Sequence, residues 1–277
     1  MTRAAGRTSD AGRGGRFDDI LGSAERSRAA AWRGSALLLT ICLAALGITG
    51  FFDATRFLDG APALAQLASE MWPPDFGRWH AWMRPLLDTL AMSIAGTALA
   101  VLASLPLALI AAPNTSPSPM LLGAARTVLS ALRSVPEIIF GVIFVAAVGF
   151  GALPGVLALA VHSTGMVAKF FAEAIEHVDP KPLEAAQAAG ATRFQVITHA
   201  VLPQVFPQLV DVAIYRWEYH FRASAVLGIV GAGGIGFELM AALRLIRYDQ
   251  VLAILLTILV CVVLVDAIGA WLRRALK

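Results

Sequence analysis

The chain has 277 residues, of which 58% are hydrophobic and 15% are charged. Soluble domains carry about 25% charged residues, so this composition excludes an ordinary soluble domain and indicates a protein of the lipid bilayer. The net charge of +3 is small, and the positions of the charges are more informative than their sum.

The first 33 residues form a basic tail ahead of the first apolar run. Its seven arginines are Arg3, Arg7, Arg13, Arg16, Arg26, Arg28 and Arg33. Such a tail can bind nucleic acid, but no interleaved aromatic surface accompanies it. We therefore expect a cytosolic tail that follows the positive-inside rule and no nucleic-acid partner.

Residues 34–85 are expected to hold the first membrane span and an external loop. Gly34 to Phe52 contains no charged residue and approaches the roughly 20 residues that a spanning helix needs. The run starts late and lacks a clear small-x-small cleavage site, which favours a retained anchor over a signal peptide. Residues 53–85 are polar and should carry short surface helices, with Trp72, Trp79 and Trp82 at the membrane interface.

Residues 86–272 should form the core of the membrane domain. The second span is expected at about 87–112, before the turn-forming Pro113–Pro119. The third should consist of an approach helix at 120–133 and a span broken at Pro136. The remaining spans are expected at about 154–177, 203–229 and 249–272, before the basic end at 273–277.

These assignments predict an all-α membrane protein of about six spans with both termini in the cytoplasm. No internal repeat is apparent, so an inverted-repeat secondary transporter has little support. Cys42 and Cys261 both lie inside apolar runs and indicate neither a disulfide framework nor a metal site.

The polar stretch 179–203 interrupts the apolar pattern between the fourth and fifth spans. Asp179 is a good N-cap, and Pro180 and Pro182 suit a first helical turn. Gly190 can end a helix in the left-handed conformation. The pattern predicts a short helix, a turn at Gly190 and a second helix that enters the fifth span, together forming a rigid knob that presses on another protein.

The fifth span carries charged residues that are costly in a membrane unless they are paired or face a cavity. Glu218 and Arg222 are four residues apart and can pair on one helix face, and Arg216 and His220 share the same spacing. One interpretation is a polar strip along a substrate path that suits an anion. The other is an intrahelical or interhelical ion-pair network that fixes packing or gating.

Further polar residues raise the same alternatives. His162, Ser163 and Thr164 either face the path or make ordinary hydrogen bonds between helices. Glu137, beside Pro136, either gates the path or lies at the membrane surface.

Residues 231–236 match the pattern G-x-G-x-x-G. A dinucleotide site requires that loop between a strand and a helix of a βαβ unit, and no such unit is predicted here. We expect a flexible turn or a tightly packed re-entrant loop at the outer face. The sequence also lacks a phosphate-binding P-loop, a nucleophile–base constellation and a metal-ligand cluster, so any ATP hydrolysis belongs to a partner.

The segment Glu184-Ala185-Ala186-x-x-x-Gly190, followed by Leu202-Pro203, resembles the EAA motif in the membrane subunits of bacterial ABC importers. The phosphonate-type permease branch is similar at the stretches Ser134–Glu137, His162–Gly165, Phe171–Glu176, Arg216–Glu218, Arg222–Ala223 and Val226–Gly236. The stronger similarity covers about 134–240, and a weaker one extends over most of 86–270.

This resemblance implies the type I importer permease (MetI-like) fold in the bacterial inner membrane. It implies a homodimer, two cytoplasmic ATPase subunits that hold ATP and Mg, and an external substrate-binding protein. Glu184, Ala185, Ala186 and Gly190 would couple the ATPase to the spans, with Leu202 and Pro203 at the start of the moving fifth helix. No cofactor is expected on this chain.

The expected function is the import of phosphonate, phosphate or phosphite by alternating access, by a transport subunit that is not itself an enzyme. A permease for methionine or betaine-like solutes shares the coupling motif and is the nearest alternative. An ion-coupled carrier is a second alternative that would need no EAA segment.

Overall fold

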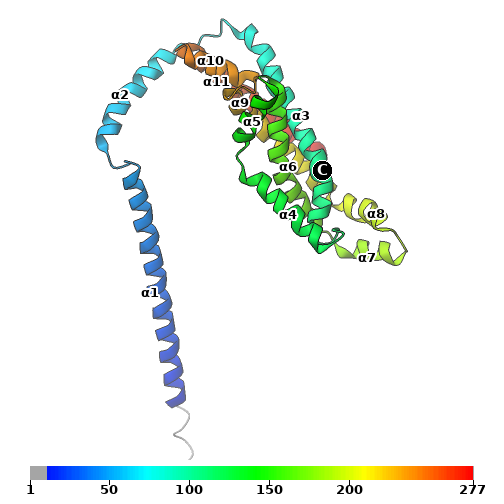
Figure 1. Cartoon of the computed structure of the whole chain (residues 1–277). Helices are drawn as coiled ribbons and strands as arrows, with labels where there is room; N and C mark the ends of the chain where they lie inside the picture. Colours follow the sequence, from blue (N-terminus) through cyan, green and yellow to red (C-terminus); the bar gives the residue numbers. More distant parts are fainter. Residues whose placement is uncertain (1–10, 277) are drawn as a thin grey trace, which may run out of the picture. The chain divides into compact units, whose positions relative to one another are not determined.

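The structure is a computed structural model that describes residues 11–276, and every regular element within that range is helical (Figure 1). Residues Met1–Gln66 and Leu67–Lys277 form two compact units. Arg3 and Arg7 of the basic tail lie outside the described residues.

The first unit contains α1 (Ala11–Ile48), and α2 (Ala54–Met71) crosses the boundary into the second. Within α1, the stretch Ala31–Ile48 is apolar enough to cross a membrane, which agrees with the predicted first span. The surface helices expected after it are a single helix, because α2 runs for 18 residues and buries none of them.

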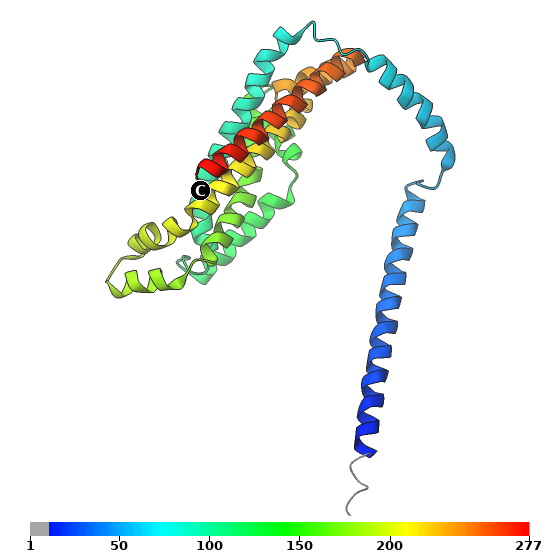
Figure 2. The ribbon, with the colours of Figure 1, turned by 180° about the vertical axis from the view of Figure 1, so that it is seen from behind.

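Four long helices build the second unit: α3 (Trp79–Ala111), α6 (Ala152–Glu176), α9 (Leu202–Ile229) and α11 (Tyr248–Ala275). They run alongside one another in both views (Figures 1 and 2). Helices α3 and α6 approach closely where Gly96 faces Leu159, since a Cβ at Gly96 would lie 2.9 Å from that of Leu159. Small residues at such crossings are typical of membrane bundles, where close backbone approach provides the packing energy.

The third predicted span is broken, as the sequence indicates. Helices α4 (Pro119–Ser134) and α5 (Glu137–Val148) meet at an angle of 84° around Pro136. Ser118 caps α4, because its hydroxyl accepts a hydrogen bond from the Leu121 N–H at 3.3 Å. The described residues hold five helices long and apolar enough to span a membrane, or six if this bent pair counts as one, which confirms the prediction of about six.

One tryptophan lies elsewhere than expected. Trp72 and Trp79 are exposed, but Trp82 is only 2% exposed and packs in a cluster with Ile235 and Ile254. Helix α3 begins at Trp79, well before the expected start near 87, and therefore carries Trp82 into the bundle. The interfacial assignment of Trp82 was wrong because the side chain faces α10 and α11.

The glycine-rich segment after α9 is a packed turn that opens a helix, α10 (Gly234–Arg244). Gly231, Gly233 and Gly234 all have positive φ angles, which L side chains rarely adopt. The N–H of Ile235 donates to Thr89 Oγ1 at 2.8 Å, which ties the turn to α3. In the described residues the turn lies between two helices, so it lacks the strand that a dinucleotide loop requires.

The connection between α2 and α3 is held against the start of α11. Asp75 accepts hydrogen bonds from the Gly77 N–H at 2.7 Å and from Gln250 Nε2 at 3.2 Å. Both bonds stabilise the charged carboxylate and lower the pKa of Asp75 below the usual aspartate value. The bond from the Gly77 N–H makes the larger contribution.

Between α6 and α9 the polar segment forms three short helical pieces. They are α7 (Pro180–Ala188), α8 (Arg193–Val196) and a π-helical turn, η1 (Ile197–Val201). Figures 1 and 2 show α7 and α8 projecting from one end of the bundle.

Candidate functional site

The projecting segment follows the predicted local structure closely. The Asp179 side chain caps α7 by accepting from the Lys181 N–H at 3.0 Å, and Pro180 is the first helical residue. Gly190 ends the helix with a φ of 80°, and its N–H donates to the Gln187 carbonyl at 2.9 Å. Helix α8 then starts at a capping box in which Thr192 and Gln195 satisfy each other's backbone N–H groups.

The residues of the EAA-like pattern present a free surface on this segment. Glu184, Ala185 and Gly190 are exposed, and Ala186 is half-buried. The Glu184 carboxylate makes no ion pair with any described residue. Leu202 and Pro203, at the start of α9, are also exposed. Small and exposed residues around one uncompensated carboxylate suit close docking by a partner protein.

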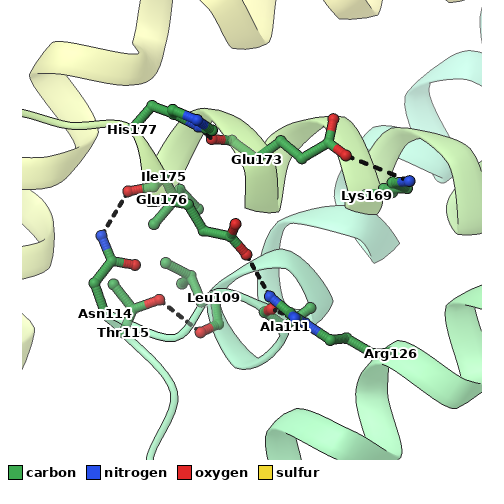
Figure 3. A network of polar contacts seen from close by, with 10 residues as sticks. All are labelled: Leu109, Ala111, Asn114, Thr115, Arg126, Lys169, Glu173, Ile175, Glu176 and His177. Atoms are coloured by element: carbon green, nitrogen blue, oxygen red, sulfur yellow. Dashed lines mark hydrogen bonds and ion pairs between the residues drawn. The ribbon is translucent and has the colours of Figure 1, made fainter. Parts of the chain in front are cut away.

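Polar side chains tie together the helix ends around the base of the segment. Gln204 Oε1 accepts from the Asp179 N–H at 3.0 Å, and Asn114 Nδ2 donates to the Ile175 carbonyl at 2.6 Å. Arg126 on α4 forms an ion pair of 2.5 Å with Glu176, the last residue of α6 (Figure 3). The first of these bonds joins the segment to α9, and the other two join the α3–α4 turn and α4 to the end of α6 just before it.

Four other helices, α3, α5, α6 and α11, contact the charged run of α9. His220 is fully buried, with Nδ1 2.7 Å from Thr97 Oγ1 and Nε2 2.5 Å from Ser163 Oγ. The same Ser163 hydroxyl accepts from Arg216 Nη2 at 2.5 Å. One serine of α6 thus holds two polar side chains of α9, while Thr97 adds a contact from α3.

A second branch of this network reaches α5. The Arg216 guanidinium lies 4.3 Å from the centre of the Tyr219 ring, a cation–π contact. The Tyr219 hydroxyl donates to Glu137 Oε1 at 3.0 Å. Glu137 Oε2 and Arg216 Nε are both buried without a hydrogen-bond partner, so the network is incompletely satisfied.

Glu218 and Arg222 do not pair with each other, because both side chains point to α11, as an interhelical ion-pair network requires. Arg222 Nη1 contacts Asp266 Oδ1 at 2.9 Å, and Arg273 Nη1 contacts Glu218 Oε1 at 2.7 Å. The 3.6-residue period allows the intrahelical pair, but only the packing of α9 on α11 decides which partner is nearer.

The remaining predicted residues stand apart from this network. Thr164 donates to the Ala160 carbonyl of its own helix at 2.7 Å. His162 Nδ1 lies 3.1 Å from the Val135 carbonyl, beside the break between α4 and α5. Asp266 and Arg273 were missed because the sequence gives no register between α9 and α11, and Thr97 was missed because it lies in an uncharged apolar run.

Comparison with known proteins identifies the architecture. Residues 104–277 match the family described as binding-protein-dependent transport system inner membrane component. A chain of the MetNI methionine ABC transporter, solved in inward-facing conformations, superposes with a TM-score of 0.63 at 24% identity. That alignment covers 71% of this chain and 96% of the other, and it supports the type I ABC importer permease fold.

Three curated relatives align over most of the sequence. The phosphite transport system permease protein PtxC of Stutzerimonas stutzeri is 64% identical over 87% of this chain and 88% of the relative. The phosphate-import permease protein PhnE of Mycolicibacterium smegmatis is 43% identical over 81% of this chain and 42% of the relative. The putative phosphite transport system permease protein HtxC of Stutzerimonas stutzeri is 40% identical over 77% of this chain and 76% of the relative.

The relatives are permease proteins and not enzymes, and the projecting segment, the broken span and the helical bundle agree with that role. The chain therefore belongs to the binding-protein-dependent transport system inner membrane components, the permease subunits of ABC importers.

Proposed function

We propose that this permease carries phosphite, or a closely related phosphorus oxyanion such as phosphate or a phosphonate, across the inner membrane by alternating access. The observation that supports this cargo is the 64% identity to a phosphite permease over 87% of the chain. A methionine permease of Pasteurella multocida is only 29% identical over 57% of the chain, so the methionine alternative is weaker.

Uptake by the assembled importer tests the cargo. Cells without other phosphorus-oxyanion importers would express this chain with its ATPase and binding protein, and accumulation of labelled phosphite would be measured against phosphate, methylphosphonate, methionine and glycine betaine as competitors. We expect competition by the phosphorus oxyanions alone, and uptake that stops on ATP depletion. Competition by methionine or betaine would overturn the cargo, and uptake without ATP would overturn the mechanism.

The segment 179–203 is proposed to dock on a cytoplasmic ATPase subunit that binds ATP and Mg. Glu184, Ala185, Ala186 and Gly190 form the docking surface, and Leu202 and Pro203 begin the helix that moves. The assignment is supported by the hydrogen bond between Gln204 and Asp179 at the base and by the exposed positions Glu184, Ala185, Gly190, Leu202 and Pro203. An external binding protein would deliver the cargo to the opposite side.

The buried network is proposed to pack the helices together, and the less buried side chains to face the path. Ser163, Arg216 and His220 bond to one another inside the chain, and Glu137 is held by Tyr219. Hydrogen bonds between membrane helices contribute about 0.6 kcal/mol each on average. Arg222 and His162 are less buried and remain the candidates for a path or gate, while Glu218 and Thr164 belong to the packing.

A second permease subunit is proposed to cover the face that carries Arg222 and Asp266. The side chains of this ion pair are 44% and 47% exposed within apolar spans, a costly arrangement against lipid. A homodimer would cover the pair or enclose it in the water-filled path. Copurification of two differently tagged copies of this chain distinguishes a homodimer from a pair of distinct permeases.

A further inference from the structure

A pocket of about 310 Å³ lies between the end of α3, the polar side of α4 and the last turns of α6. Its polar wall contains Arg126, Ser130, Arg133, Lys169, Glu173 and Glu176. Ala111, Leu129 and Ala172 form an apolar wall, so the pocket is amphipathic. It is separate from the buried network of α9.

The charges of this pocket leave one cation without a counterion. Arg126 pairs with Glu176, and Lys169 pairs with Glu173 at 3.4 Å (Figure 3). Arg133 instead donates to the Leu129 carbonyl and the Ser130 hydroxyl of its own helix, and it makes no ion pair with a described residue. Three cations and two carboxylates give the lining a net charge of +1.

The position of α4 places the pocket at the membrane surface. Helix α4 meets α5 at an angle of 84°. When α5 crosses the bilayer, α4 therefore runs nearly along the membrane surface. Leu121 and Val128, on the side of α4 away from the pocket, are 47% and 50% exposed. An amphipathic helix with this distribution lies at the level of the lipid headgroups. Glu176 also lies only three residues before Asp179, where the projecting segment begins.

We infer that this pocket binds the phosphodiester headgroup of an anionic phospholipid, with Arg133 as the main contact and Arg126 and Lys169 beside it. A phosphodiester carries one negative charge, which matches the net charge of the lining. Basic pockets between membrane helices on the cytoplasmic side are a known class of headgroup site. The amphipathic wall suits a headgroup better than a small free oxyanion, which shares the phosphate chemistry but has no apolar part.

Native mass spectrometry of the purified full chain tests the site, with phosphatidylglycerol as the probe and phosphatidylcholine as the reference lipid. Arg133→Gln should weaken phosphatidylglycerol binding about fivefold, because one basic residue near anionic lipid contributes about that factor in affinity. Arg274→Gln is the matched control, since Arg274 also donates from Nε to the carbonyl four residues earlier but does not line the pocket. Its binding should equal that of the wild type.

A second variant should raise the affinity for phosphatidylglycerol, and it keeps every basic residue of the pocket. Glu173→Gln raises the net charge of the lining and should tighten phosphatidylglycerol binding. Thermal unfolding in phosphatidylcholine alone should be the same for all variants, which separates lipid binding from folding.

The assignment would be overturned by equal binding of Arg133→Gln and wild type, by an equal loss in Arg274→Gln, or by no tightening in Glu173→Gln. Displacement of the lipid by millimolar phosphate or phosphite would assign the pocket to a free oxyanion instead. The measurement uses neither ATPase nor cargo transport, so it is independent of the proposed function.

Discussion

Glu218 shows how a single carboxylate is accommodated inside the bundle. Its side chain is only 8% exposed and contacts Arg273 at 2.7 Å. The space that it occupies exists because residue 269 on α11 is glycine, and a Cβ there would overlap the carboxylate. The ion pair therefore depends on the glycine. Glu218 and Gly269 lie 51 positions apart in the chain.

Substituting this glycine should destabilise the protein. Gly269→Ala forces the Glu218 carboxylate away from Arg273, and overpacking of this kind costs about 1–3 kcal/mol. Gly123→Ala is the control, because Gly123 also lies inside a helix but has no atom within 4 Å of its would-be Cβ. Thermal unfolding in nanodiscs should show a lower Tm for Gly269→Ala only. Equal Tm values for the two variants would refute this account of Glu218.

At the scale of elements, the projecting segment is a helical hairpin bonded to α9 at its base. Its caps lie at Asp179 and Thr192, Gln204 bonds it to α9, and the Arg126–Glu176 pair joins α4 to the end of α6 just before it. The α3–α4 turn backs it across a pocket of about 360 Å³ lined by Asn114, Leu183 and Arg193 among others.

Reversing the charge of the docking surface should uncouple the importer. Glu184→Lys is expected to lower ATP-driven uptake by about tenfold or more, since a wrong charge across an interface costs several kcal/mol. Lys181→Glu is the matched control on the same helix and should retain uptake. Uptake, ATPase stimulation and the amount of protein in the membrane would be measured together. Normal uptake by Glu184→Lys would remove the coupling role.

Gly190 offers an independent check on the same element. Its φ of 80° is incompatible with proline, whose ring fixes φ near −65°. Gly190→Pro should therefore abolish uptake, whereas Gly190→Asn should retain most of it because asparagine tolerates the left-handed conformation. Equal uptake by both variants would show that the turn geometry is not needed.

At the scale of the whole molecule, the orientation in the membrane follows from the basic ends of the chain. With six spans, both termini and α7 should face the cytoplasm, and α2 should face the outside. This orientation is also what the docking of α7 on an ATPase requires.

Cysteine labelling tests the orientation. In a chain with Cys42 and Cys261 replaced by serine, Asp59→Cys on α2 and Lys181→Cys on α7 each present one exposed thiol. A membrane-impermeant maleimide applied to intact spheroplasts should label the first position and reach the second only after permeabilisation. The reverse pattern would invert the topology and place the projecting segment outside.

The sequence by itself determined the class of protein, the number of spans and the local form of the projecting segment. These features depend on composition, on apolar run length and on short-range capping signals such as Asp179, Pro180 and Gly190, all of which act within a few residues. The break at Pro136 was also predictable, because proline disrupts a helix wherever the helix packs.

Only the tertiary structure decided which distant residues meet. The partners of Glu218 and Arg222 on α11, the burial of Trp82, and the sharing of Ser163 by Arg216 and His220 all depend on the rotation and register of one helix against another. A single sequence carries no direct signal for register between helices, because side-chain packing over the whole bundle sets it. The lining of the α3–α4–α6 pocket, which joins residues as far apart as Ala111 and Glu176, follows from the same packing.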